Sequence, residues 1–87
     1  MSTGTQTETH AERELASFLA SQPTLEQVIA FHPSAEVAER MYELIDTERD
    51  GQLGEEERRE LETYLQIEHL MRLVKAEARR RLAHQGS

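Results

Sequence analysis

The 87-residue sequence has no cysteine and no tryptophan, two prolines, and only two tyrosines and two phenylalanines. The absence of cysteine excludes disulfides and thiolate metal sites, and the few aromatic side chains imply an aliphatic core. No apolar run approaches the roughly 20 residues of a membrane-spanning helix, and the N-terminus lacks a basic start followed by an apolar block. We therefore expect a cytoplasmic protein with neither a membrane span nor a signal peptide.

Apolar residues recur at steps of three and four along most of the chain, which is the period of an amphipathic helix. Thr9 with Glu12 and Thr24 with Gln27 match the capping-box pattern of a helix start, and Ser34 is placed to cap a third helix. The sequence predicts one all-α domain over residues 9–84, after a disordered polar tail over residues 1–8. Its four helices are expected over about residues 10–21, 25–32, 35–46 and 55–83.

The last two helices are expected to form a central helix-turn-helix hairpin. Apolar side chains on the two sides of the turn should pack against one another, namely Met41, Leu44 and Ile45 against Leu61, Tyr64 and Leu65. At ~1.5 Å per residue the last helix would be ~43 Å long, which exceeds the width of so small a domain. It is also apolar on more than one side, so it needs more than one neighbour.

The turn of this hairpin resembles the twelve-residue calcium loop of an EF-hand. Counted from Asp46, acids occupy positions one, three, five and twelve, and Gly51 stands at position six. Calcium binds about six to eight oxygens, which carboxylates at alternate positions of a loop supply. The candidate calcium ligands are Asp46, Glu48, Asp50 and Glu57.

The same residues also fit a plain, solvent-exposed helix connection. Gly51 suits the left-handed residue that ends a helix, and Gly54 followed by three glutamates suits the start of the next one. Asp or Asn is usual where Glu48 stands, an apolar residue is usual where Arg58 stands, and no second acidic loop of this form is present. The plain turn is the preferred interpretation, and calcium binding is the alternative.

The four histidines form no catalytic or metal-binding pattern. His10, His32, His69 and His84 have neither the His-x-x-x-His nor the His-Glu-x-x-His spacing that places two ligands on one helix face. The sequence also has no glycine-rich phosphate loop and no serine in a nucleophile elbow. We therefore expect a protein that is not an enzyme.

The net charge of −7 is unevenly distributed along the chain. Acids dominate from Glu43 to Glu62, whereas the last helix ends with Arg79, Arg80 and Arg81. An acidic balance argues against non-specific nucleic-acid binding by the whole domain, because phosphate contacts need clustered cations. The basic end either complements the helix macrodipole or contacts phosphate directly, and the first is the simpler explanation.

Three leucines of the last helix, Leu65, Leu70 and Leu73, do not fit its inward face, and the last two predict a binding surface. Leu70 and Leu73 lie to one side of that face, with cations close by in the sequence. An exposed apolar strip rimmed by cations suits an acidic protein partner or a second copy of the chain. In the alternative, the first helix folds back and covers both leucines. The predicted partner-binding residues are Leu70, Leu73, Arg72, Lys75 and Arg79.

Three stretches resemble a group of short, uncharacterised all-helical bacterial proteins. They are Pro23-Thr24-Leu25-Glu26-Gln27, the run Gly51-Gln52-Leu53 followed by Glu55-Glu56-Glu57, and the leucine-rich run that begins at Glu60-Leu61 and continues through Glu68-His69-Leu70-Met71-Arg72-Leu73 to Ala78. Members of that group are often encoded beside nuclease genes, notably those of HNH-type endonucleases. The resemblance therefore implies an antitoxin-like or accessory role, and it implies no site residues.

The sequence as a whole predicts a non-enzymatic protein-interaction module that uses its long C-terminal helix and needs no cofactor. The expected partner is a protein, either a nuclease encoded nearby or a second copy. A single-loop calcium-binding protein is the first alternative. A helical DNA-binding regulator that uses the basic end is a weaker one.

Overall fold

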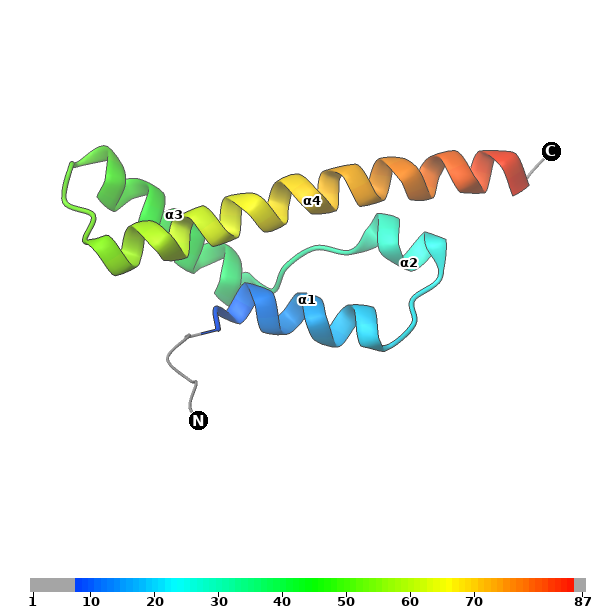
Figure 1. Cartoon of the computed structure of the whole chain (residues 1–87), viewed down its shortest axis with the longest axis horizontal. Coiled ribbons are helices and arrows are strands. Elements are labelled where there is room, and N and C mark those ends of the chain that lie inside the picture. The colour runs from blue at the N-terminus through cyan, green and yellow to red at the C-terminus, as the bar shows by residue number, and fades with distance from the viewer. Residues whose placement is uncertain (1–7, 86–87) are drawn as a thin grey trace.

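The computed structural model describes residues 8–85, and these residues form helices without any strand. The predicted all-α class is confirmed, as is the long C-terminal helix. The helices, shown in Figure 1, are α1 (His10–Ala20), α2 (Leu25–Ala30), α3 (Ala35–Arg49) and α4 (Glu55–Gln85). Apart from Glu8, the predicted tail lies outside the described residues.

Helix α4 is the axis on which the other three helices pack. Its 31 residues correspond to about 46 Å, close to the full 51 Å length of the molecule. Helix α3 crosses the first half of α4, and α2 lies along its second half (Figure 1). The last turns of α4 extend past α2. No helix among residues 8–85 combines the length and apolar character needed to span a membrane.

Three helices begin at caps that their sequences specify locally. In α1 the Glu12 amide donates to the Thr9 hydroxyl at 3.0 Å, and the Thr9 amide donates to the Glu12 carboxylate at 2.9 Å. Thr24 and Gln27 repeat this capping box at the start of α2. The Ser34 hydroxyl accepts from the Val37 amide at the start of α3. These reciprocal bonds satisfy N–H groups that have no partner inside the helix, so both predicted capping boxes and the predicted Ser34 cap are confirmed.

Helix α3 continues to Arg49, three residues beyond its predicted end at Asp46. The chain turns away from the helix axis at Gly51. The φ of Gly51 is left-handed, at +73°, and its amide donates to the Glu48 carbonyl oxygen at 2.9 Å. The Gln52 amide donates to the Thr47 carbonyl oxygen at 3.1 Å. These two bonds form a Schellman motif, so the first acids of the predicted loop belong to the helix.

Helix α1 ends in the same way but with a less suitable residue. Gln22 has a left-handed φ of +58°, and its amide donates to the Leu19 carbonyl oxygen at 3.1 Å. The next residue, Pro23, has no N–H, so the second bond of the motif cannot form. Gln22 is the only residue other than glycine with positive φ among residues 8–85. The turn therefore stores backbone strain of about 1 kcal/mol.

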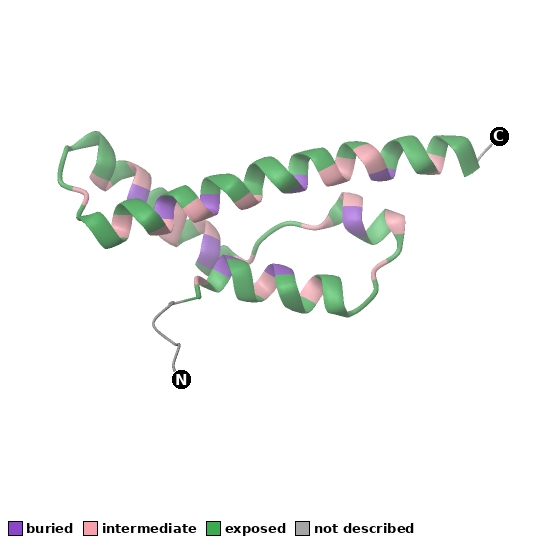
Figure 2. Ribbon diagram, viewed as in Figure 1, coloured by how far each residue is buried: buried purple, intermediate pink, exposed green. Residues whose placement is uncertain are grey.

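The buried hydrophobic cluster lies where α1 and α3 meet the first half of α4. The central cluster contains Ala11, Val37, Leu44, Leu61 and Tyr64. Met41, Ile45, Leu53 and Ile67 pack around it. Figure 2 shows the buried positions of α4 on the side that faces the other helices. The predicted hairpin packing is confirmed except for Leu65, which is 45% exposed and lies outside the cluster.

Candidate functional site

The largest exposed apolar side chains of the distal half of α4 are Leu70 and Leu73. Their exposed fractions are 51% and 55%. At about 100° per residue the two leucines are about 60° apart around the helix, so they lie on adjacent parts of one face. We call this pair the outer strip. Neither α1 nor α2 covers it, so the alternative in which α1 folds back over both leucines is wrong.

The three predicted cations of the partner surface lie on other sides of α4. By the same rotation Arg72 is about 100° from Leu73, Lys75 about 160° from Leu73, and Arg79 about 180° from Leu70. The cavities that these residues line support this placement. Arg72 and Lys75 line a cavity between α1 and α4, whereas Leu73 lines a groove between α2 and α4. These three cations therefore lie to the sides of the face that carries the leucines or opposite it, and their predicted role in binding a partner stays a prediction.

Two of these cations already have partners within the fold. The Lys75 ammonium donates to the carbonyl oxygen of Phe31, which follows α2 in the chain. Arg72 lies 3.6 Å from Glu68 one turn earlier in the helix, in an exposed ion pair. Arg79 is exposed and makes no ion pair with any residue in the range 8–85. Lys75 therefore helps to hold α4 against the segment after α2, and it does so on the face away from the outer strip.

By the same rotation, Arg80 and Arg81 lie on the side of α4 that carries the outer strip, about two to three turns further along the helix. Both guanidinium groups donate hydrogen bonds to the Glu77 carboxylate, with nitrogen–oxygen distances of 2.6–3.1 Å. Arg80 first, and then Arg81, hold the pKa of Glu77 below its usual range. One carboxylate is thus shared by two guanidinium groups, and this end of the helix keeps a net positive charge.

An open groove of about 440 Å³ lies beside the outer strip, between α2 and α4. Its apolar lining includes Leu73 of the strip, and Glu77 and Arg81 are its charged residues. The other apolar residues that line it are Leu25, Val28, Val74 and Ala78. The groove and the strip together form a continuous apolar surface with a basic end.

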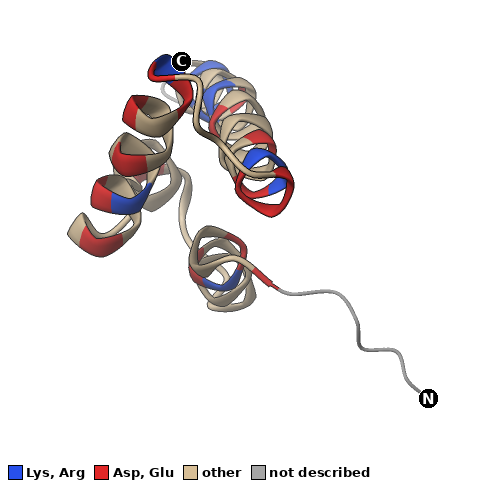
Figure 3. Cartoon of the chain, turned by 90° about the vertical axis from the view of Figure 1, so that its left-hand side faces the viewer, with Lys and Arg blue, Asp and Glu red and all other residues tan. Residues whose placement is uncertain are grey.

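The charge distribution along the molecule follows the prediction. Figure 3, which faces the hairpin end, shows Asp and Glu along α3 and at the near end of α4, with Lys and Arg also further along α4. The first turn of α4 contains Glu55, Glu56 and Glu57, where acids complement the positive end of the helix dipole. The acidic end and the basic end are therefore separated by most of the length of α4.

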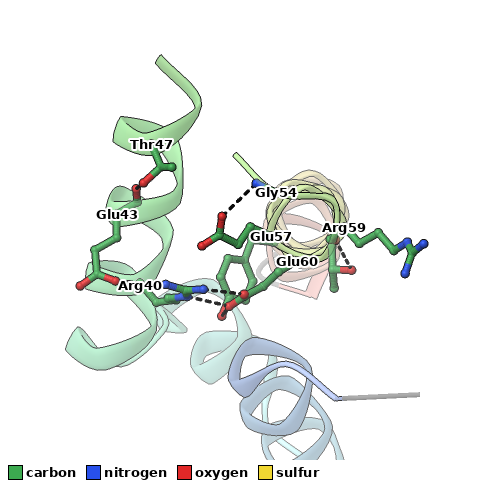
Figure 4. A network of polar contacts seen from close by, with 9 residues as sticks. Arg40, Glu43, Thr47, Gly54, Glu57, Arg59 and Glu60 are labelled. Atoms are coloured by element: carbon green, nitrogen blue, oxygen red, sulfur yellow. Dashed lines mark hydrogen bonds and ion pairs between the residues drawn. The ribbon is translucent and has the colours of Figure 1, made fainter. Parts of the chain in front are cut away.

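The four candidate calcium ligands occupy the turn of the hairpin in different structural settings. Asp46 and Glu48 lie within α3, and Asp50 caps its C-terminus. The Glu57 carboxylate accepts from the Gly54 amide at 3.0 Å, and so it serves as a cap at the start of α4 (Figure 4). Within residues 8–85, no three His, Cys, Asp or Glu side chains are grouped to hold a metal ion. The turn as it stands has the geometry of the plain helix connection.

A polar network at the hairpin was not anticipated from the sequence. The Arg40 guanidinium of α3 donates to both carboxylate oxygens of Glu60 on α4 (Figure 4), and the buried Tyr64 hydroxyl donates to the same carboxylate at 2.9 Å. Arg40 first, and also Tyr64, hold the pKa of Glu60 below its usual range. Burial, together with the bond to Glu60, raises the pKa of Tyr64 to about 12. Every group in this network has a partner, which fits a structural role.

The fold and these surfaces define an all-α protein built on one long helix, with an exposed apolar strip near its basic end. Comparison of the chain with protein-family models, with curated proteins and with solved structures gave no match.

Proposed function

We propose that this protein is a non-enzymatic interaction module that binds a partner protein on the outer strip and the adjoining α2–α4 groove. The partner element that fits best is an amphipathic helix with acidic residues at one end. Its apolar face would cover Leu70 and Leu73, and its acids would lie near Arg80 and Arg81. This is a helix-in-groove contact, in which apolar anchors at helical spacing provide the affinity.

The observation that carries the proposal is the half exposure of two leucines on adjacent parts of one helix face. Isolated exposed leucines are common on protein surfaces, but these two adjoin a groove with further apolar lining. Complete burial of a leucine side chain contributes about 1.5–3 kcal/mol, so two half-exposed leucines leave a useful part of that free energy for binding.

The resemblance of the sequence to proteins encoded beside HNH-type endonucleases supports a nuclease as the partner. In that setting the module would restrain or assist the enzyme, as an antitoxin-like or accessory protein does. A second copy of the chain is the alternative partner. An antiparallel pair of α4 helices would place the basic end of each copy near the acidic hairpin of the other.

Sedimentation of the purified protein, alone and mixed with the product of the adjacent gene, tests the proposal. We expect a complex in the mixture, and we expect Leu70→Glu and Leu73→Glu each to weaken it about tenfold or more, as hot-spot residues do. A dimer of the protein alone that the same variants dissociate would identify the second copy as the partner.

Leu65→Glu is the matched control, because Leu65 is 45% exposed on the same helix but does not line the groove. It lies about 140° from Leu70 and about 80° from Leu73 around the helix, more than two turns before Leu73. The control variant should bind like the wild type. A monomer in both runs would contradict the proposal if Leu70 and Leu73 are also protected from exchange or labelling. Equal losses in all three variants would also contradict it.

A further inference from the structure

A cavity of about 280 Å³ lies beneath α4, on the side that faces α1 and away from the outer strip. Helix α1, the segment after α2, the first half of α3 and the middle of α4 all contribute to its wall. Its lining is mostly apolar and includes Leu15, Phe31, Met41, Tyr64, Ile67 and Met71. The cavity therefore divides the central cluster around Leu44 from the packing of α2 against the distal half of α4.

This cavity is partly open to solvent, and it is larger than the voids found inside packed proteins. Protein interiors are close-packed, with few voids larger than a water molecule. An engineered apolar cavity of about 150 Å³ stays dry and binds benzene. A cavity nearly twice that volume has room for a ligand with a chain of about seven or eight carbons, and each apolar atom that fills it gains contacts that the empty wall lacks.

The charged side chains around the cavity are not equivalent. The Glu14 carboxylate accepts from the Ser34 amide at the start of α3, at 3.0 Å. Glu68 lies 3.6 Å from the guanidinium of Arg72. Both acids on the lining thus interact with a donor of the protein itself.

The Lys75 ammonium, like the Glu14 carboxylate, bonds a neutral backbone group. It donates to the Phe31 carbonyl oxygen and forms no ion pair with any of residues 8–85. An ammonium has three N–H donors, so Lys75 can bond a second acceptor without releasing Phe31. Lys75 therefore keeps spare N–H donors that a ligand carboxylate can bind, whereas the Glu14 carboxylate can only accept hydrogen bonds.

We propose that this cavity binds a small amphipathic carboxylate, with its apolar chain among Leu15, Met41 and Met71 and its carboxylate against Lys75. Arg72 lies one turn before Lys75 on the helix and adds a second cation at the same edge. A charge-assisted bond between the ammonium and a carboxylate selects the anion over a neutral molecule of the same shape. The site is separate from the outer strip and does not depend on the function proposed above.

Methionine methyl resonances provide a direct test. The chain has three methionines, and Met41 and Met71 line the cavity whereas Met1 lies outside the described residues. In protein labelled at the methionine methyl carbons, titration with octanoate should shift the Met41 and Met71 signals to saturation and leave the Met1 signal in place. Octanol, the neutral probe of the same length, should bind more weakly.

Two variants and one control test where the probe binds and whether the charge of Lys75 contributes to its binding. Lys75→Met should weaken octanoate binding about tenfold, the equivalent of one charge-assisted bond, and bring it close to that of octanol. Arg79→Met is the matched control, because Arg79 is a cation on the same helix that does not line the cavity. Leu15→Phe should reduce binding of both probes by occupying the cavity, and its circular dichroism and melting curve show whether it is folded.

Several outcomes would overturn the proposal. They are unshifted Met41 and Met71 signals with both probes, equal affinity for octanoate and octanol in the wild type, and equal losses in Lys75→Met and Arg79→Met. Collapse of the dispersed spectrum on titration would show detergent-like unfolding and would also count against the site. If Leu15→Phe does not fold, the comparison of Lys75→Met with Arg79→Met still decides whether the proposal holds.

Discussion

Arg40 on α3 and Glu60 on α4 are joined by two parallel hydrogen bonds, of 3.0 and 2.9 Å, from one guanidinium to one carboxylate. The two residues are 20 positions apart in the sequence and fix how the helices of the hairpin cross. Their side chains are 38% and 25% exposed, so water screens the pair only in part. The bidentate geometry and the third bond from Tyr64 make this the most specific polar contact of the fold.

We expect this ion pair to contribute about 1 kcal/mol to stability, at the upper end for a partly exposed pair. A double-mutant cycle with Arg40→Met and Glu60→Gln, measured by urea unfolding, gives the coupling free energy. The exposed pair of Glu55 and Arg59, separated by 3.9 Å, is the control, and its coupling should be near zero. Equal coupling in the two pairs would show that the bidentate geometry has no special value.

The same pair predicts how stability depends on pH. The pKa of Glu60 is lower in the folded chain than its ordinary value of 4.5, so the unfolded chain binds the proton more tightly. The contribution of Glu60 is therefore present in full above 4.5 and is lost as the pH falls through the lower folded value. Unfolding curves from neutral pH down into this range should lose less stability in Glu60→Gln than in the wild type. Identical losses would contradict the assignment.

Two turn residues should respond to substitution in opposite directions. Gly51 has a left-handed backbone and open space around its Cα, so Gly51→Ala should destabilise the protein by about 1 kcal/mol through backbone strain alone. Gln22 has the same backbone handedness, so Gln22→Gly should raise stability by up to about 1 kcal/mol. Thermal melting of both variants measures the effects. A gain for Gly51→Ala or a loss for Gln22→Gly would show that these conformations are not fixed in solution.

Leu61 should be far more important for stability than Leu70, although both are leucines of α4. Leu61 is 3% exposed in the central cluster, and Leu61→Ala should cost about 2–5 kcal/mol. Leu70 is 51% exposed, and Leu70→Ala should cost less than about 1 kcal/mol. Chemical denaturation distinguishes the two variants. A loss below about 1 kcal/mol for Leu61→Ala would place this residue outside the core.

Calorimetric titration tests the calcium alternative at the turn. Asp46 and Glu48 are held in α3, and Glu57 caps the start of α4, so binding would require the end of one helix to unwind. We expect no heat of binding with a dissociation constant below about 1 mM. A calcium-dependent heat that disappears in Asp46→Ala would show that the turn rearranges into a binding loop.

The features that sequence analysis predicted correctly are those set by local spacing. Thr9 with Glu12, and Thr24 with Gln27, specify helix starts within four residues, and the steps of three and four from Leu61 to Ala78 specify a buried face. The predicted end of α3, at Asp46, lies three residues before the observed one, because the acids from Asp46 onwards also fit a loop. There the Schellman bonds around Gly51, rather than the composition, set the boundary.

The remaining features depend on how helices meet in space. Nothing in the sequence distinguishes Arg40 from other cations as the partner of Glu60, although Glu60 and Tyr64 at positions i and i+4 indicated a shared face. Nearness in sequence suggested that Arg72 and Lys75 surround Leu73, but the rotation of the helix places them elsewhere. The cavity between α1 and α4 depends on the distance between these two helices, which no local sequence pattern encodes.

Helix α4 is packed against other helices over only part of its length, so its two ends should differ in how readily they unfold locally. Near Leu61 and Tyr64 the helix is enclosed by the central cluster, whereas most residues after Ala78 are exposed and the last turns extend past α2. Amide hydrogens of one continuous helix should therefore exchange slowly at the hairpin end and progressively faster towards Gln85. We expect this end of α4 to unfold locally while the hairpin stays folded, so contact with another molecule should slow its exchange first.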